Sequence, residues 1–506
     1  MRRILSILAL TSLLLGMSTV AWAIPLRYAE DRAPAIVNPL FTTTMSEARL
    51  DELVFDGLYT DDMELRSTPA LVDTAEVAED RMSTTLHLKP DVQWHDGEPF
   101  TADDVVFTIQ AMQNPATAST EAGRVGWIKN AVKVDDHTVH LDFKRPEYAP
   151  EDKLHFKILP AHEFDSTTVK RSNAFRNKPV GTGPFQVVSF NDDNSITMQR
   201  NPNYFDPVKQ DEIVMREVAD KNYQAKLIIY QSIEALVRVL PRDLAALQAD
   251  RKVEMYPYQT NSWWYIGFNN DGARLHDERV REALRDMVDV EALLKPIGTG
   301  EVVTGPFVPS SPFYNHDVPE QKVDIDKATS LLTAAGYYYD GRQWTKNGKP
   351  LTFRLAAPET LETAQDVVIN LQAQFRKQGI TVQPEFLGVA EWKQRVWRDH
   401  DFDLILSQWS FDRSEDIYEQ FHSHGARNFV GYSNRKVDAL LDEARNAVDP
   451  QKKKEALRQA HTLIAADVPM VFLWTLDSYA AMSVRVKQVV VHPFYFFTWA
   501  KDWYVY

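Results

Sequence analysis

Segments with strand and helix patterns alternate between residues 351 and 407, and this order restricts the fold more than any other feature of the sequence. Three short apolar segments have the composition of buried strands, and the two segments between them have helical periodicity: strands at 351–357, 380–386 and 403–407, and helices at 360–378 and 389–398. Strands that alternate with helices predict a parallel sheet covered on both faces. We therefore predict an α/β fold.

The rest of the chain adds hairpins and well-marked helix starts. The hairpin pattern occurs at 71–90 and 130–145, and two further strands are predicted around a polar turn within 181–200. Helix starts are marked by Thr101 with Asp104, which form a capping box, and by Asp449 before Pro450. Because there is no internal repeat or low-complexity linker, we expect the domains to be joined by short crossovers.

The first 23 residues have the layout of a secretory signal peptide. Arg2 and Arg3 precede an apolar run over 4–15, and small residues flank a cleavage point near Ala23. The run is shorter than the roughly 20 apolar residues that a membrane span needs. The sequence contains no cysteine, which excludes both a lipid anchor on a cysteine and a disulfide framework. We therefore predict an exported chain that is not a lipoprotein.

Length and charge exclude several classes of partner. A chain of 506 residues predicts two to four domains. The formal net charge is −15, and loss of Arg2 and Arg3 with the signal peptide makes it more negative. An acidic chain without a basic patch argues against binding to nucleic acid or to an anionic membrane surface.

Several motifs, in order along the chain, resemble the extracellular solute-binding proteins of the peptide and nickel importer family (family 5). They cover nearly the whole mature chain: NPL at 38–40, VFDGL at 54–58, LHLKPDVQWHDGEPFTADDVVFTI at 86–109, VGTGPF at 180–185, RNPNYF at 200–205, ERVREALRDMVD at 278–289, ATSLLTAAGY at 328–337 and NFVGYSNRKVDALLDEA at 428–444.

The resemblance implies the two-lobed α/β fold of periplasmic binding proteins, in its large, three-domain variety. It has a hinge and a ligand cleft between the lobes. Lobe I is expected to comprise 24–57, 185–260 and 480–506, with a β-rich inserted domain at 58–184, and lobe II to comprise 261–479. Ligand capture would be a hinge closure of the two lobes.

The resemblance also implies a function. The protein would be the periplasmic substrate-binding component of an ABC importer, a monomer without cofactor or catalysis that delivers a peptide or peptide-like solute to a membrane permease. Chelated nickel, an oligosaccharide or an amphipathic sterol-like molecule are alternative solutes. A secreted hydrolase, or a chaperone of exported chains, are alternatives from other classes, although no hydrolase motif marks a nucleophile.

The segment after the third predicted strand is the expected ligand site, because ligands of open α/β sheets bind beyond the carboxyl ends of strands. Gln408, Trp409 and Asp412 follow the predicted strand end. In peptide-binding relatives an aspartate three residues after this tryptophan pairs with the peptide α-ammonium group, and Asp412 matches that position. The alternative is a helix-capping or surface aspartate. Relatives often have Asp-Pro where this chain has Glu415-Asp416, which leaves the ligand class open.

Aromatic residues at the expected crossover are further candidates. Trp263, Trp264 and Tyr265 open lobe II, and we predict that at least one of the two tryptophans contacts the ligand while others enter the core. We predict that Trp392 and Trp397 serve helix packing.

Three motifs have both a chemical and a structural interpretation, and the structural one is favoured for each. His422 and His424 are spaced to chelate a transition metal, but we favour solvated loop histidines. Residues 94–99, WHDGEP, combine possible metal ligands with turn chemistry, and we favour a turn. Residues 181–185, GTGPF, lack the remaining parts of a phosphate-binding loop and predict a tight crossover instead.

Overall fold

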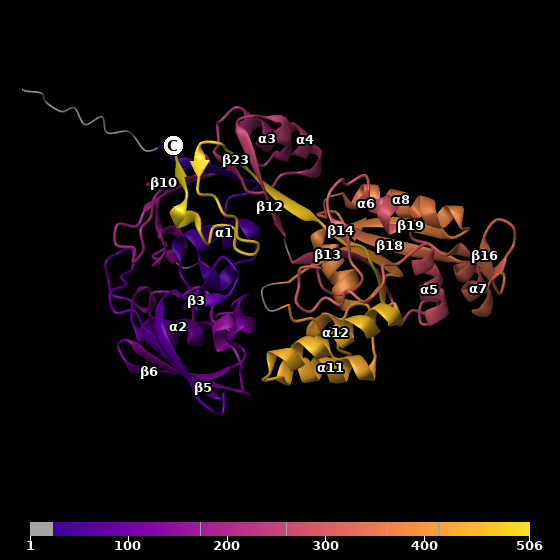
Figure 1. The fold of residues 1–506 in the computed structure, drawn as a ribbon, viewed down its shortest axis with the longest axis horizontal. Helices are drawn as coiled ribbons and strands as arrows, with labels where there is room; N and C mark the ends of the chain where they lie inside the picture. The colour runs from indigo at the N-terminus through magenta and orange to yellow at the C-terminus, as the bar shows by residue number, and fades with distance from the viewer. Residues whose placement is uncertain (1–23, 173, 260, 362, 412–414) are drawn as a thin grey trace, which may run out of the picture.

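The chain folds into two lobes that lie side by side, each built around its own sheet (Figure 1). The computed structural model describes residues 24–506 except 173, 260, 362 and 412–414. Among these described residues, no helix combines the length and the apolar character that crossing a bilayer requires. Helices and strands are mixed in both lobes, so the predicted two-lobed α/β fold is confirmed.

The first lobe contains a seven-stranded sheet assembled from segments far apart in the sequence. The strand order is β12-β23-β11-β1-β10-β9-β8. The strands are β1 (Leu26–Glu30), β8 (Phe185–Phe190), β9 (Ile196–Arg200), β10 (Glu212–Glu217), β11 (Ala235–Leu236), β12 (Val253–Gln259) and β23 (Asp477–Ser483). Helices α1 (Met45–Val54), α3 (Lys221–Ile229) and α4 (Leu244–Ala249) accompany this sheet. Strand β1 pairs in parallel with both of its neighbours, which come from the middle of the chain.

A second sheet of the first lobe, with order β4-β5-β7-β6, confirms the predicted hairpins. Its elements and their neighbours are β2 (Tyr59–Asp61), β3 (Ser67–Pro69), β4 (Val72–Val77), β5 (Ser83–Leu88), α2 (Ala102–Gln113), β6 (Ile128–Asp135) and β7 (Thr138–Phe143). Helix α2 begins with the predicted capping box of Thr101 and Asp104. The buried Asp104 also accepts hydrogen bonds from the Trp94 indole at 3.3 Å and from the Ala161 amide at 2.7 Å, which fixes two turns to the helix start.

The second lobe contains a five-stranded sheet of order β19-β18-β20-β13-β21. Its strands are β13 (Ser262–Phe268), β18 (Thr352–Pro358), β19 (Thr381–Leu387), β20 (Leu404–Ser410) and β21 (Met470–Phe472). The helical elements are α5 (Glu278–Asp286), α6 (Val290–Leu294), α7 (Ile325–Ala334), α8 (Ala364–Lys377), α9 (Val389–Trp392), the π-helical turn η7 (Lys393–Arg398), α10 (Tyr418–Phe421), α11 (Arg435–Asn446) and α12 (Pro450–Asp467). The predicted β-α-β-α-β series is therefore present, and β18 pairs in parallel with both β19 and β20.

Small elements complete the two lobes. Short strands are β14 (Glu301–Val302), β15 (Tyr338–Tyr339), β16 (Trp344–Lys346), β17 (Lys349–Pro350), β22 (Trp474–Thr475), β24 (Val486–Lys487) and β25 (Tyr504–Val505). Single 3-10 turns are η1 (Pro39–Phe41), η2 (Ala122–Val125), η3 (Pro150–Lys153), η4 (Ala161–Glu163), η5 (Ala174–Asn177), η6 (Pro241–Asp243) and η8 (Ala500–Asp502).

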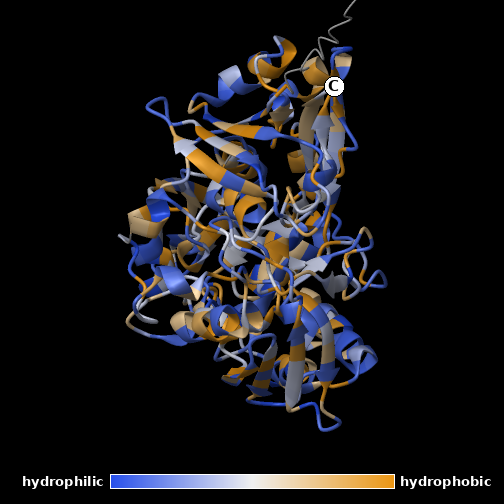
Figure 2. Ribbon diagram, turned by 90° about the vertical axis from the view of Figure 1, so that its left-hand side faces the viewer, coloured by the Kyte–Doolittle hydropathy of each residue, from blue (hydrophilic) through white to orange (hydrophobic). Residues whose placement is uncertain are grey.

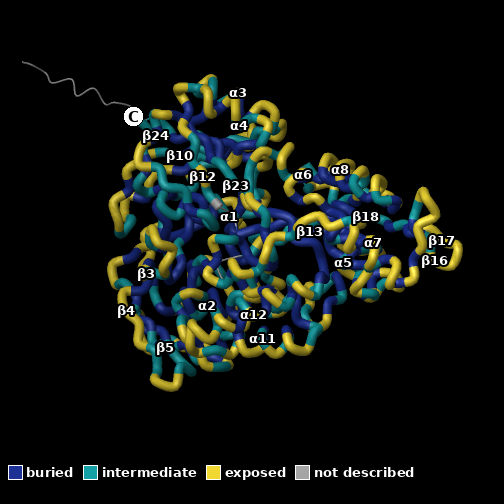
Figure 3. Tube along the Cα trace, turned by 45° about the vertical axis from the view of Figure 1, so that its right-hand side comes forward, coloured by how far each residue is buried: buried dark blue, intermediate teal, exposed yellow. Residues whose placement is uncertain are grey.

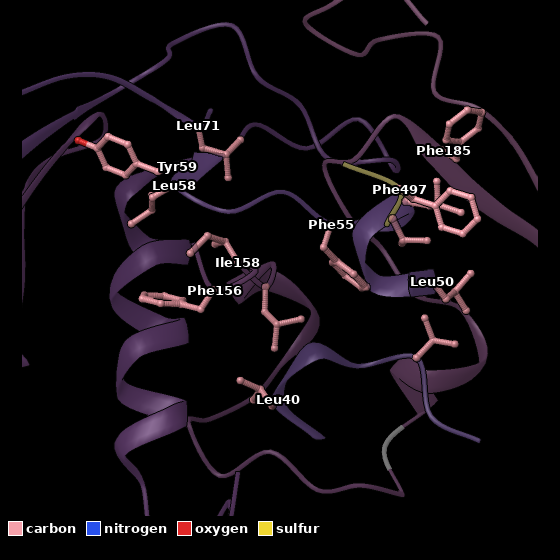
Figure 4. Close-up of a cluster of buried hydrophobic side chains, with 14 of the residues drawn as sticks. Leu40, Leu50, Phe55, Leu58, Tyr59, Leu71, Phe156, Ile158, Phe185 and Phe497 are labelled. Carbon is pink, nitrogen blue, oxygen red and sulfur yellow. The ribbon is translucent and has the colours of Figure 1, made fainter. Parts of the chain in front are cut away.

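The hydrophobic cores divide at the same places as the sheets. Two clusters draw only on residues 26–258 and 479–505, and the other two draw only on residues 263–476. Figure 3 shows buried segments in the interior of both lobes, and Figure 2 shows hydrophobic and hydrophilic segments alternating along the ribbon. Figure 4 shows how one first-lobe cluster combines Leu50 of α1, Phe156 of the 144–184 segment and Phe497 near the C-terminus. Each lobe therefore has a core of its own.

The chain passes between the lobes twice. The first crossover joins β12 to β13, and the second joins β22 to β23. In the first lobe, β12 and β23 are paired with each other as far as Gln259 and Asp477. The two crossovers therefore leave the first lobe side by side. Both crossovers are only a few residues long, which agrees with the expectation of short connections.

The GTGPF motif forms a close crossing over the end of α1. The Gly183 amide donates to the Val54 carbonyl oxygen at 2.9 Å, and the Thr182 hydroxyl donates to Asp56 at 3.0 Å. A Cβ atom at Gly181 would lie 1.8 Å from the Val54 oxygen. Glycine is required here because two backbones touch, which confirms the predicted tight crossover.

Candidate functional site

One edge of the second-lobe sheet gathers the features expected of a ligand site. Because β18, β19 and β20 are parallel, their carboxyl ends at Pro358, Leu387 and Ser410 lie along one edge. Strand β13 is antiparallel to β20 and begins with Ser262 opposite Ser410, so the first crossover enters the lobe at this same edge. Ligands of open α/β sheets bind beyond such an edge.

The predicted site residues of β20 lie inside the strand. The strand runs to Ser410, three residues further than predicted, so Gln408 and Trp409 are part of it rather than following it. The prediction was wrong here because the apolar run ends at Leu406, whereas strand pairing with the opposite residues of β13 continues through polar positions. Both side chains are half-buried. Asp412 lies outside the described residues.

The three aromatic residues of β13 belong to the interior of the lobe. Trp263 and Tyr265 lie in one core cluster, and Trp264 lies in the other, as alternation along a strand requires. Trp263 is completely buried against Tyr265, with ring centroids 5.3 Å apart, and Trp264 packs on Trp474 at 5.9 Å. Their contact with a ligand stays a prediction.

Two buried polar atoms, one just before and one within the start of β13, have no hydrogen-bond partner among the residues that the structure describes. They are Oδ1 of Asn261 and Nε1 of Trp263. An unpaired buried polar group costs about 1–3 kcal/mol. The entry to the second lobe therefore carries one acceptor and one donor that the described part of the chain does not satisfy.

Glu415 joins the candidate ligand loop to the crossover. Its side chain is buried, and the carboxylate accepts hydrogen bonds from Asn261 Nδ2 at 2.8 Å and from Ser311 Oγ at 3.0 Å. The adjacent Asp416 pairs with Arg445 at 2.8 Å. Glu415 and Asp416 are the two residues that replace the Asp-Pro often found in relatives. Both carboxylates form contacts that fix the end of the loop. The sequence departure marked these positions, but Asn261 and Ser311 carried no sequence signal.

Trp392 and Trp397 do not have the same role. Trp392 is buried in the core, as predicted. Trp397 is 43% exposed and stacks on Phe429 with ring centroids 5.6 Å apart. The packing prediction for Trp397 is therefore wrong, because the π-helical turn η7 directs Val396 inward and leaves Trp397 at the surface.

The histidine pair has a structural environment. His422 is buried, its Nδ1 accepts the His424 amide at 3.0 Å, and its ring stacks on Tyr418 with centroids 4.2 Å apart. The prediction of solvated histidines is therefore wrong for His422, whereas His424 is exposed. Within the described part of the chain, the pair has no third metal-ligating side chain close enough to share an ion.

The WHDGEP segment forms the predicted turn, with the Gly97 amide donating to the Trp94 carbonyl oxygen at 2.9 Å. His95 contributes to the GTG crossing, since its Nδ1 accepts the Gly181 amide at 3.1 Å. Burial lowers the pKa of His95 to about 4, so this ring is neutral at pH 7.

The turn also brings the exposed Asp96 beside His162 and Glu163. The potential metal-ligating atoms of these three residues lie within 4.8 Å of one another, a proximity that sequence reasoning missed.

Comparison with known proteins identifies the family that has this fold. A model of the bacterial extracellular solute-binding proteins, family 5, matches residues 66–429. The oligopeptide-binding protein AppA of Bacillus subtilis is 25% identical over 482 residues, which cover 91% of this chain and 88% of AppA. The dipeptide-binding protein of Escherichia coli is 24% identical over 520 residues, covering 95% of this chain and 96% of that protein.

Solved structures agree with this match. AppA from Bacillus subtilis in complex with a nonapeptide is similar with a TM-score of 0.81 and 25% identity, covering 95% of this chain and 99% of that chain. NikZ from Campylobacter jejuni in complex with Ni(L-His) has the same fold, with a TM-score of 0.82, 24% identity, and coverage of 95% and 99%. The family model matches well over half of the sequence. The chain therefore belongs to the bacterial extracellular solute-binding proteins of family 5.

Proposed function

We propose that the protein is the periplasmic receptor of an ABC importer and binds a peptide or peptide-like solute between its lobes. The observation that carries the proposal is the near full-length similarity to oligopeptide- and dipeptide-binding relatives, one of them solved with a nonapeptide. The candidate site at the edge of the second-lobe sheet supports it, because aromatic rings and a fixed carboxylate lie where the chain enters from the first lobe.

In this proposal the lobes correspond to 24–57, 185–260 and 480–506 on one side, with the insertion at 58–184, and to 261–479 on the other. The two short crossovers serve as the hinge, because each lobe packs its own core and the chain passes from one lobe to the other through these segments. The receptor functions through a difference in ligand affinity between its open and closed states, and it carries out no chemical step. We propose that the Asp412 carboxylate pairs with the α-ammonium group of the peptide.

The experiment is native mass spectrometry of the mature protein purified without denaturation. We expect a heterogeneous set of bound peptide masses. Asp412→Ala should lose them and should bind added peptide about 100-fold more weakly, since truncation of one partner of a buried charge pair costs 2–5 kcal/mol. Asp326→Ala, which changes an exposed carboxylate in the first turn of α7, is the matched control.

Two outcomes would contradict parts of the proposal. A single non-peptide mass or a bound metal complex would overturn the peptide assignment while keeping the receptor role. Equal peptide retention by Asp412→Ala and Asp326→Ala would remove Asp412 from the site while keeping the peptide assignment.

A further inference from the structure

Three aromatic rings from different segments stack beside the candidate site. Trp409 comes from β20, Phe429 precedes α11, and Trp397 comes from the π-helical turn η7. Phe429 lies between the two indoles, with centroid distances of 5.6 Å to Trp397 and 6.0 Å to Trp409. The ring planes are nearly parallel, at interplanar angles of 9° and 17°.

The spacing shows that the rings overlap only partly. Parallel rings in contact have faces separated by about 3.5 Å, so centroids this far apart imply sideways offsets of about 4–5 Å. Each ring therefore covers only part of the next ring. We call each of the three offset rings a step of the stack. The uncovered parts are accessible, because Trp397 is 43% exposed and both Phe429 and Trp409 are only partly buried.

The stack begins at the ligand edge of the sheet, with Trp409. Trp409 directly precedes Ser410, the last residue of β20, and the segment that carries Trp397 follows the end of β19. The turn that carries Trp397 is π-helical, and the Asp399 amide donates to the Gln394 carbonyl oxygen at 3.0 Å across five residues. Such turns occur frequently at functional sites, and here the turn places a large apolar ring at the surface.

The charges around Trp397, the outermost ring of the stack, favour contact with a neutral group of the ligand. Lys393 lies with its Nζ 5.6 Å from the centroid of Trp397. Arg395 is held by Glu385 at 2.6 Å and by Asp401 at 3.2 Å, so it does not compete for the ring. An added cation would be repelled by the nearby ammonium group, whereas a neutral aromatic ring would stack on the uncovered faces.

We propose that Trp397, Phe429 and Trp409 form an aromatic subsite that selects peptides carrying a phenylalanine, tyrosine or tryptophan side chain. The inference rests on the proposed peptide-binding function and deepens it. Trp409 supplies the step nearest the crossover, and Trp397 supplies the outermost step. An aromatic side chain of the ligand adds a ring to the stack, while an alanine in its place leaves the faces in water.

The test is calorimetric titration of the mature protein, freed of bound solute by unfolding and refolding, with tetra-alanine and with four variants that carry one phenylalanine each. We expect at least one variant to bind the wild type about tenfold more tightly than tetra-alanine. Trp397→Ala should abolish this preference and leave tetra-alanine affinity within about twofold, whereas Trp397→Phe should keep a preference. Tyr338→Ala, which removes a 70% exposed ring on β15 of the same lobe, is the matched control.

The outcomes separate this inference from the proposed function. Binding of tetra-alanine and all variants with equal affinity overturns the subsite but keeps the peptide receptor. An equal loss of affinity for every peptide in Trp397→Ala also overturns it, because the ring would then act on the loop rather than on the side chain. Absence of binding of all five peptides by the wild type overturns the proposed function and the subsite with it.

Discussion

Replacing Gly181 by alanine is expected to destabilise the protein by at least about 3 kcal/mol. The added Cβ would lie 1.8 Å from the Val54 carbonyl oxygen and 2.8 Å from its carbon. Both are backbone atoms at the end of α1, so no side-chain rotation relieves the overlap. The chain must move apart, which breaks the hydrogen bonds that His95 and Thr182 form across this crossing.

The measurement is the denaturant midpoint of the protein in guanidinium chloride, with Gly123→Ala as the matched control. A Cβ at Gly123 meets no atom within 4 Å, so this variant should unfold like the wild type. If the two alanine variants unfold at the same denaturant concentration, close backbone approach is not what requires glycine at 181.

The second large effect concerns the buried Asp51 of α1. Burial raises the pKa of its carboxyl group to about 8. Thr42 Oγ1 donates to Oδ2 at 2.6 Å, whereas Oδ1 is buried and has no partner among the described residues. The folded state therefore holds this proton more tightly than the unfolded chain does. The corresponding stability is fully present below about pH 4 and is lost as the pH rises toward 8.

We expect Asp51→Asn to remove this loss, since the amide keeps the shape and an acceptor for Thr42. The variant should exceed the wild type in stability by a few kcal/mol at pH 8.5 and by much less at pH 5. Thermal unfolding at the two pH values measures the difference, and Asp192→Asn, in an exposed turn, is the control. A gap between variant and wild type that does not change with pH would show that Asp51 does not carry the proton.

The sequence predicted the fold where local signals are strong. Helix α8 ends before Gly379, whose φ of +74° suits glycine, and α12 begins with the Asp449 cap followed by Pro450. Such features depend on neighbouring residues only. The seven-stranded sheet could not be assembled in this way, because β1 and β10 are nearly 190 residues apart and their pairing depends on tertiary contacts. The resemblance to a family supplied that part of the expectation.

The site was predicted less completely. Strand alternation correctly indicated that the aromatic residues of β13 would divide between two sides, but not that the strand is buried on both. Trp397 has the sequence context of a helix, and the π-helical turn that exposes it has no recognisable pattern. Asn261 and Ser311 are unremarkable polar residues until Glu415 meets them in space. Groups brought together from distant segments carry no local signal.

The division of the sheets also sets the order in which the lobes can be completed as the chain emerges during synthesis or export. Residues 262–475 form one uninterrupted span, so the second-lobe sheet and its two cores are available before the last thirty or so residues appear. The central sheet of the first lobe needs β23, and its core needs Phe497 and Trp503 beside Tyr28. The N-terminal segment, although made first, must therefore wait for the C-terminus before it is fully packed.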